Sequence, residues 1–219
     1  EEAVSLAKQA DTVLLCLGLD ELRESEGLDR ADMALAENQQ QLLAAVAAVN
    51  PNVVVLLSAG APVETPWVGR CKALVYGALG GQAGAGAAAD ILTGKLCPCG
   101  KLSQTWAQAH DDTPAKANFG GEGRNVEYRE GLYVGYRYYQ TAGVKPAFPF
   151  GYGLSYTTFE YSGLKADETG VTLTVTNTGS AAGAEIVQLY VAKPDAKVFR
   201  PEQELKGFAK VSLAPGESK

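Results

Sequence analysis

Histidine is almost absent from this sequence, since His110 is the only one in 219 residues. A serine nucleophile needs a histidine as its base, and neither Ser58 nor Ser103 lies in the Gly-x-Ser-x-Gly pattern of serine hydrolases. Two aspartates follow His110, which is typical of a surface turn. The sequence therefore gives no support for a Ser-His-Asp triad.

Cysteine is also scarce, and the four present are Cys16, Cys71, Cys97 and Cys99. Cys97 and Cys99 have neither a second cysteine pair nor histidines to complete a zinc site, so no metal is expected. Cys16 lies within an apolar run and Cys71 precedes another, and we expect both to be buried as small hydrophobic residues. This usage indicates a reducing, cytoplasmic location. The first residues show no export leader, although one could belong to an upstream segment.

The chain lacks both an excess of positive charge and long apolar runs. Its formal net charge of -6 at pH 7 argues against binding to nucleic acid or to an anionic membrane surface. No apolar run approaches the length needed to span a bilayer. Hydrophobic residues at 46% and charged residues at 20% are typical of a soluble globular protein with a real core.

The first half of the chain alternates helical and strand patterns. Helices are expected at residues 2–10, 35–49 and 82–92, and buried strands at residues 12–18, 53–57 and 73–76. Strands separated by helices pair in parallel through right-handed crossovers. The predicted fold class is therefore α/β, with a mostly parallel sheet and flanking helices.

The second half changes to a period of two. Residues 171–176, 185–191 and 203–213 alternate apolar and polar side chains and end in turn residues. Such strands are typical of an immunoglobulin-like β-sandwich, which needs about seven of them. Only four can be counted before Lys219, so we expect a partial sandwich.

Three segments follow from these patterns. They are an α/β-sandwich domain over residues 1–117, an aromatic-rich linker over 118–158, and a fibronectin-type-III-like β-sandwich over 159–219. Most of the aromatic residues lie between 128 and 161, without clear periodicity. We favour a role for them as packing between domains, although aromatic faces also stack on sugar rings.

A glycine-rich run at residues 77–86 follows a strand and opens a helix, which is the context of phosphate binding at a helix N-terminus. No Gly-Lys-Ser/Thr follows it, and the requirements of a dinucleotide fingerprint are not clearly met. Small residues that let the helix pack closely on the sheet explain the run better. No cofactor is therefore expected.

The most informative segment is residues 24–30, where three carboxylates and an arginine occur together. It belongs to a polar connection over residues 19–34, which is longer than compact domains usually have without a function. In open α/β sheets, ligands bind beyond the carboxyl ends of the strands. The segment is therefore a candidate source of catalytic carboxylate, and a solvated surface loop is the alternative.

Glu26 is the candidate acid in this segment. Neighbouring negative charge from Glu24 and Asp29, together with desolvation in a closed site, favours the protonated form of a carboxyl. A protonated carboxyl can donate to a glycosidic oxygen and then act as a base toward water. Arg30 could offset this effect or orient one of the acids through a bidentate contact.

These motifs resemble glycoside hydrolase family 3, the β-glucosidase and β-xylosidase family, nearly from end to end. Residues 25–30 are similar to its Gly-Glu-Gly-Tyr-Asp-Arg loop. Four further segments resemble the family's second domain, namely residues 80–84, 100–102, 128–139 and 148–156. The stretch from residues 177–179 through 204–208 resembles its fibronectin-type-III-like domain.

The resemblance implies a retaining, exo-acting β-glycosidase whose substrate is a β-linked glycoside or oligosaccharide. In that family an Asp nucleophile comes from a separate (β/α)8 barrel of the same protein, and an acid/base Glu comes from a loop of the α/β-sandwich. The matching residue here is Glu26. Ser25 and Leu28 replace the family's common Gly and Tyr, so Glu24 is kept as the alternative acid/base. The residues that bind the sugar are not predicted.

A function of another class stays open. A non-catalytic carbohydrate-binding or docking module would use the aromatic residues 128–161 and not the acidic segment.

The chain holds no barrel, and we expect it to be truncated at both ends. Retaining hydrolysis needs two carboxyls about 5–5.5 Å apart, and the second is missing here. We therefore predict that the purified 219-residue chain has no appreciable glycosidase activity, measured as turnover of an aryl β-glucoside. Turnover above the uncatalysed rate would contradict this prediction.

Overall fold

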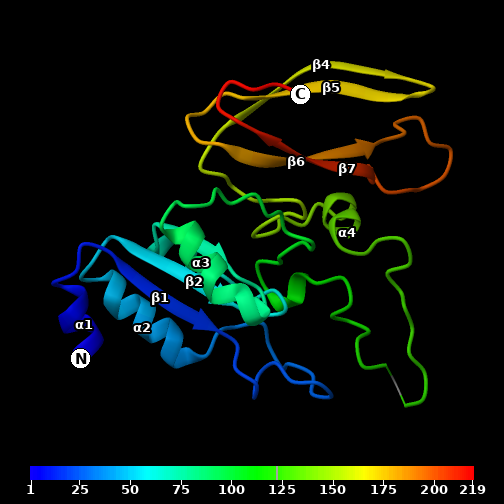
Figure 1. Ribbon diagram of the computed structural model, residues 1–219. Helices are drawn as coiled ribbons and strands as arrows, with labels where there is room; N and C mark the ends of the chain where they lie inside the picture. The colour runs from blue at the N-terminus through cyan, green and yellow to red at the C-terminus, as the bar shows by residue number, and fades with distance from the viewer. Residues whose placement is uncertain (122) are drawn as a thin grey trace. The chain divides into compact units, whose positions relative to one another are not determined.

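The computed structural model describes residues 1–121 and 123–219, which form two compact units (Figure 1). The first unit comprises residues 1–88, 106–127 and 145–147, and the second comprises residues 89–105, 128–144 and 148–219. The chain passes between the units several times. The division at residues 117/118 and 158/159 stays a prediction.

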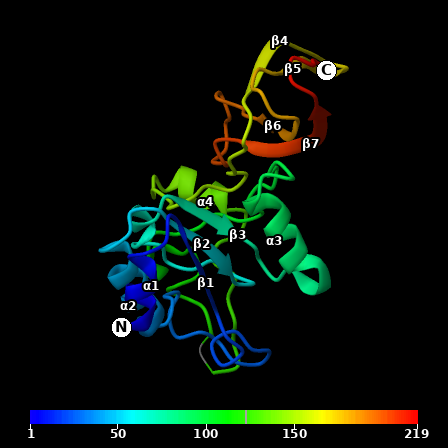
Figure 2. The same ribbon diagram turned by 60° about the vertical axis from the view of Figure 1, so that its left-hand side comes forward.

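A three-stranded parallel sheet, in the order β1-β2-β3, forms the centre of the first unit. Its strands are β1 (Val13–Gly18), β2 (Val53–Ser58) and β3 (Ala73–Tyr76). The helices are α1 (Glu2–Ala7), α2 (Glu37–Ala47) and α3 (Gly84–Leu92). Helices α1 and α2 lie on one side of the sheet, and α3 begins on the other (Figure 2). The predicted α/β fold class is confirmed.

The core of this unit lies between α2 and one face of the sheet. Val53, Val55 and Leu57 of β2 are completely buried, because alternate residues of a strand point to the same face. Leu43 and Val46 of α2 are also buried, and their spacing of three places them on one side of the helix. Burial of each such side chain contributes about 1.5–3 kcal/mol.

Asn50 fastens the end of α1 to the residues that precede β2. Its side chain is 5% exposed, and Nδ2 donates to the carbonyls of Ala7 at 2.9 Å and Ala10 at 2.7 Å. The side-chain oxygen accepts a hydrogen bond from the Asn52 amide. The buried amide is therefore satisfied in both its donor and its acceptor groups.

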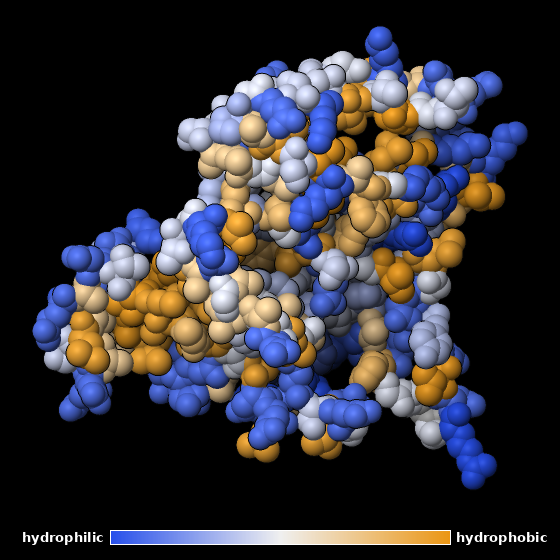
Figure 3. All heavy atoms as spheres, viewed as in Figure 1, coloured by the Kyte–Doolittle hydropathy of each residue, from blue (hydrophilic) through white to orange (hydrophobic). Residues whose placement is uncertain are grey.

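The opposite face of β1 is open. Leu14 is 46% exposed and Cys16 is exposed, and Figure 3 shows apolar side chains gathered over β1. The prediction that Cys16 is buried was wrong. The strand is apolar on both faces, which is the pattern of a strand that is covered on both sides. Among the described residues, however, only one of its faces is covered.

The second unit contains four antiparallel strands, as predicted. They are β4 (Phe159–Asp167), β5 (Gly170–Asn177), β6 (Gly183–Val191) and β7 (Glu204–Leu213). Strand β4 pairs with β5, and β6 pairs with β7. The predicted partial immunoglobulin-like β-sandwich is confirmed.

Asn177 links these strands through a completely buried side chain. Its Nδ2 donates to the carbonyls of Ala181 at 2.9 Å and Leu213 at 3.1 Å. Its Oδ1 accepts from the Thr157 hydroxyl at 2.7 Å and the Gly179 amide at 3.1 Å. All four hydrogen bonds that an asparagine side chain can make here are formed, which explains the Asn at this turn.

The aromatic segment contains a helix that the sequence did not predict, α4 (Tyr136–Thr141). Tyr136 stacks on Phe150 with ring centres 5.2 Å apart and meets Tyr190 edge-on at 5.7 Å. Its hydroxyl accepts a hydrogen bond from the Leu205 amide at 2.8 Å. These contacts join residues far apart in the sequence, so no local periodicity predicts the helix.

Short 3-10 turns at Val68–Arg70, Gly81–Ala83 and His110–Asp112 complete the described structure. No helix among residues 1–121 and 123–219 is both long enough and apolar enough to cross a membrane.

A half-buried ion pair joins Lys101 and Glu185 at 3.1 Å, with each side chain 14% exposed. Lys101 Nζ also donates to the Gly153 carbonyl at 2.8 Å, and Glu185 Oε1 accepts from the Tyr161 hydroxyl at 3.0 Å. Burial, followed by the hydrogen bond to Glu185 and the charge of Glu185, raises the pKa of Tyr161. Removal of the lysine would leave the Glu185 carboxylate sheltered from water without its cation.

We therefore expect Lys101→Ala to lower the free energy of unfolding by about 3 kcal/mol, measured by urea denaturation of the chain. Lys95→Ala is the matched control, because Lys95 is 72% exposed in its ion pair with Asp90. Its cost should stay below about 1 kcal/mol. Equal losses for the two variants would contradict the structural role of Lys101.

Iodoacetamide should modify Cys16 faster than Cys71 in the folded chain. Alkylation requires an accessible thiolate, and Cys16 is exposed, whereas burial raises the pKa of the Cys71 thiol. Mass spectrometry of peptides from partly alkylated protein measures both rates. Denatured protein is the control, since unfolding should remove the difference, and faster labelling of Cys71 in the folded chain would oppose this expectation.

Candidate functional site

The acidic loop, defined here as residues 19–34, leaves the carboxyl end of β1 beside the loop that follows β2. Gly18 and Ser58 are paired at the ends of these strands, and the Leu19 amide donates to the Ser58 carbonyl at 3.0 Å. A Cβ at Gly18 would collide with that carbonyl, so only glycine fits. The segment after β2, residues 59–65, is called the β2 loop below. Both loops therefore start at the same edge of the sheet.

Glu26 lies at the tip of a tight turn within the acidic loop. Ser25 and Leu28 form an isolated antiparallel bridge, and the Leu28 amide donates to the Ser25 carbonyl at 3.4 Å. Gly27 has φ of +77°, as the third residue of a type II turn requires. The Glu26 side chain is exposed, and among the described residues no hydrogen bond or ion pair restrains it.

Glu24, two residues earlier, is held in place. Its Oε2 accepts a hydrogen bond from the Gly60 amide at 2.8 Å. Burial, and then the negative charge of Glu24, raises the pKa of Tyr76, whose hydroxyl donates to the Ala59 carbonyl at 2.8 Å. The two candidate carboxylates therefore differ, because Glu24 is bound to the β2 loop and Glu26 is free at the turn.

Gly60 was not identified from the sequence as a residue of this site. A Cβ there would lie 2.9 Å from both Glu24 Oε1 and Leu79 Cδ1. The only signal available was its position, since a glycine just past the end of a strand often marks a close approach of another group.

The two sides of the acidic loop are also fastened. Asp20 Oδ1 accepts from the Arg23 amide at 3.0 Å, and the Arg23 guanidinium lies 3.6 Å from Asp32. Further along, the Glu64 amide of the β2 loop donates to the Met33 carbonyl at 2.8 Å. The turn that bears Glu26 therefore projects from a loop with restrained ends.

Arg30 contacts the β2 loop and not a carboxylate of its own loop. Its Nη1 donates to the Pro62 carbonyl at 3.1 Å. Its Nη2 is buried, and no hydrogen-bond partner for it occurs in the part of the chain that the structure describes. The expected contact between Arg30 and one of the acids is not formed.

The other motifs form no comparable site. The His110 amide donates to Glu64 Oε1 at 2.7 Å from within a 3-10 turn, as a turn residue would. In the glycine-rich run, a Cβ at Gly80 would lie 2.7 Å from the Gly84 backbone, whereas one at Gly86 would meet open space. Close packing thus requires a glycine at Gly80 only. Among the residues described, no group of three or more His, Cys, Asp or Glu could hold a metal.

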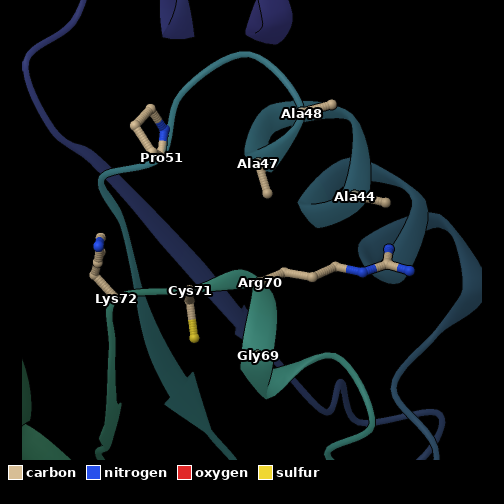
Figure 4. A pocket seen from close by; sticks show the side chains of 8 residues that line it. All are labelled: Ala44, Ala47, Ala48, Pro51, Gly69, Arg70, Cys71 and Lys72. Atoms are coloured by element: carbon tan, nitrogen blue, oxygen red, sulfur yellow. The ribbon is translucent and has the colours of Figure 1, made fainter.

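A hollow of about 550 Å³ lies at the other edge of the sheet (Figure 4). Pro51 and Lys72, which line it, precede β2 and β3, so the hollow lies at the amino ends of these strands. The acidic loop leaves the carboxyl end of β1, and the hollow is therefore separate from it. Its other lining residues are Ala44, Ala47, Ala48, Gly69, Arg70 and Cys71.

Comparison with known proteins gives matches along most of the chain. Residues 1–156 match the family model described as the glycosyl hydrolase family 3 C-terminal domain, and residues 185–219 match that of a fibronectin type III-like domain. The chain is 49% identical over 226 residues to thermostable β-glucosidase B of Acetivibrio thermocellus, and the match covers 100% of this chain and 30% of that relative. It is 49% identical over 224 residues to an exo-α-(1→6)-L-arabinopyranosidase of Bifidobacterium breve, with the same 100% and 30% coverage.

Solved structures agree with these matches. The crystal structure of a family 3 β-glucosidase from Bifidobacterium adolescentis superposes with a TM-score of 0.97 at 50% identity, over 100% of this chain and 33% of that one. The β-glucosidase of Kluyveromyces marxianus in complex with glucose gives 0.94 at 45% identity, over 100% and 27%. The chain thus spans about a third of the length of these relatives. It belongs to glycoside hydrolase family 3, as the C-terminal α/β domain followed by a fibronectin type III-like domain.

Proposed function

We propose that this chain is the part of a retaining exo-β-glycosidase that supplies the acid/base carboxylate, and that this carboxylate is Glu26. The supporting observation is the contrast between the two neighbouring acids. Glu24 accepts a hydrogen bond from Gly60 at 2.8 Å, whereas Glu26 is exposed on the turn. An acid that must approach a substrate oxygen needs a free carboxyl, since proton transfer requires hydrogen-bond contact.

The resemblance to the family implies that the second carboxylate is an Asp nucleophile on a (β/α)8 barrel elsewhere in the parent protein. The chain spans 30% of its curated relatives, which leaves length for such a domain. The nucleophile attacks the anomeric carbon while Glu26 donates its proton to the departing glycosidic oxygen. Glu26 then removes a proton from water, which attacks the glycosyl-enzyme and releases the nucleophile. Each of the two displacements inverts the anomeric carbon, so the configuration is retained overall.

The substrate class is a β-linked glycoside or oligosaccharide, and likeness to the relatives does not select one sugar. The β-glucosidase and the arabinopyranosidase named above match the chain equally, at 49% identity, although their names give different activities. The cytoplasmic location that cysteine usage indicates stays a prediction.

The alternative, a binding module, would need exposed aromatic faces in residues 128–161. Tyr136 packs against Phe150 and Tyr190 and Tyr139 is 5% exposed, whereas Tyr128 is 86% and Tyr156 53% exposed. Some rings of the segment serve packing and others are exposed, so the binding module stays the alternative.

The test is Glu26→Gln in the full-length parent enzyme. We expect hydrolysis of a disaccharide, whose leaving group is poor, to fall by about 10²- to 10⁴-fold. An aryl glucoside with a strongly acidic phenol should be much less affected at the first step, because its departure needs no proton. Azide should restore turnover and give a β-glycosyl azide, since an anionic nucleophile needs no general base.

Glu21→Gln is the matched control. Glu21 lies in the same loop, is exposed, and makes no hydrogen bond or ion pair with any described residue. Its replacement should leave disaccharide hydrolysis unchanged. An unchanged rate for Glu26→Gln would refute the proposed role of Glu26, and azide rescue of Glu24→Gln in its place would transfer that role to Glu24.

A further inference from the structure

We propose that Glu24 is a positioning residue, which holds the turn bearing Glu26 in place through the backbone amide of Gly60. This inference rests on the proposed role of Glu26. It assigns a separate task to the second carboxylate of the loop, which the sequence could only rank as an alternative acid. The supporting contact is the 2.8 Å hydrogen bond from the Gly60 amide to Glu24 Oε2.

The acidic loop has an anchor on each side of its tip. Glu24 is bound to Gly60 immediately before the turn, and Arg30 donates to the Pro62 carbonyl at 3.1 Å after it. Both partners belong to the β2 loop. Glu26 lies between the two anchors, only two residues from the first, so a displacement of Glu24 is transmitted to it almost directly.

The β2 loop is a firm base for these anchors. Ala59 and Val63 are completely buried, and the Tyr76 hydroxyl donates to the Ala59 carbonyl at 2.8 Å. Tyr76 in turn meets the ring of Trp106 edge-on, with centres 4.9 Å apart, and Trp106 is 1% exposed. The Gly60 amide is therefore fixed from the core side, and its hydrogen bond restrains the acidic loop at Glu24.

Glycine at position 60 leaves room for the contact. A Cβ there would lie 2.9 Å from Glu24 Oε1 and from Leu79 Cδ1, so the flexible ends of these two side chains would have to shift. Since the carboxylate accepts from a backbone N–H, the bond is charge-assisted and stronger than one between neutral groups. In a Glu24→Ala variant the Gly60 amide would lose this acceptor, and the tip would lose its nearer anchor.

A misplaced acid has a kinetic signature that a damaged fold lacks. Proton donation matters for a poor leaving group and hardly at all for an activated one. Loss of folded enzyme lowers both rates by the same factor. The ratio of kcat/KM for a disaccharide to kcat/KM for an activated aryl glucoside therefore reports the placement of Glu26 independently of the amount of active protein.

The experiment compares four variants of the full-length enzyme by this ratio. Glu24→Ala should lower it by about tenfold or more, the effect of one charge-assisted hydrogen bond. Glu24→Gln keeps an acceptor oxygen at the same distance and should stay within about threefold of the wild type. Gly60→Ala should lower the ratio less than Glu24→Ala, because the amide donor is kept and its methyl group meets only the flexible ends of Glu24 and Leu79, which can shift. Glu21→Ala, in the same loop but without a described partner, is the control and should change nothing.

The outcomes separate this inference from the proposed function, provided that Glu26→Gln is measured alongside. If Glu26→Gln lowers the ratio and Glu24→Ala does not, Glu26 remains the acid and the positioning role is refuted. If Glu24→Gln loses as much as Glu24→Ala and azide rescues it, Glu24 is itself the acid, and both ideas fail. If Glu26→Gln leaves the ratio unchanged, the proposed function fails, and no positioning role for Glu24 survives it.

Discussion

The close pairing of Gly18 with Ser58 determines how the functional edge of the sheet is built. No side chain fits at Gly18, so β1 approaches the end of β2 fully. Gln39 of α2 completes this junction, since its side chain accepts from the Gly18 amide at 2.9 Å and donates to the Gly18 carbonyl at 2.8 Å. Gly18 is thus held by β1, β2 and α2 together, and the acidic loop begins from this fixed residue next to the β2 loop.

Two carboxylates in one short loop acquire different properties from this junction. Glu24 faces the β2 loop and finds the Gly60 amide, whereas Glu26 lies on the far side of a turn that Gly27 makes possible. One carboxylate is thereby hydrogen-bonded to the β2 loop and the other is exposed. This difference is a property of the tertiary structure, because both residues are glutamates in an equally acidic sequence.

Patterns that depend on neighbours along the chain predicted most strands of both units and most helices. Predictions that depended on distant residues failed or could not be made. Exposure of Cys16 depends on what covers the sheet, and α4 is stabilised by rings such as Phe150 and Tyr190. Likewise, the partner of Arg30 is a carbonyl of the β2 loop, whereas local charge suggested a carboxylate. Local charge already pointed to Glu26 and the family resemblance matched it, whereas the difference between its contacts and those of Glu24 required coordinates.

The bond between Glu24 and Gly60 has a consequence for any transfer of this site to another protein. The two residues are 36 positions apart in the chain, so the Glu24 carboxylate is held by a contact between two loops. A side chain at position 60 would meet the flexible ends of Glu24 and Leu79, and these would have to shift for the bond to be kept. Transplantation of the acidic loop into another scaffold would succeed only when the β2 loop is moved with it. The acidic loop and the β2 loop therefore form one structural unit.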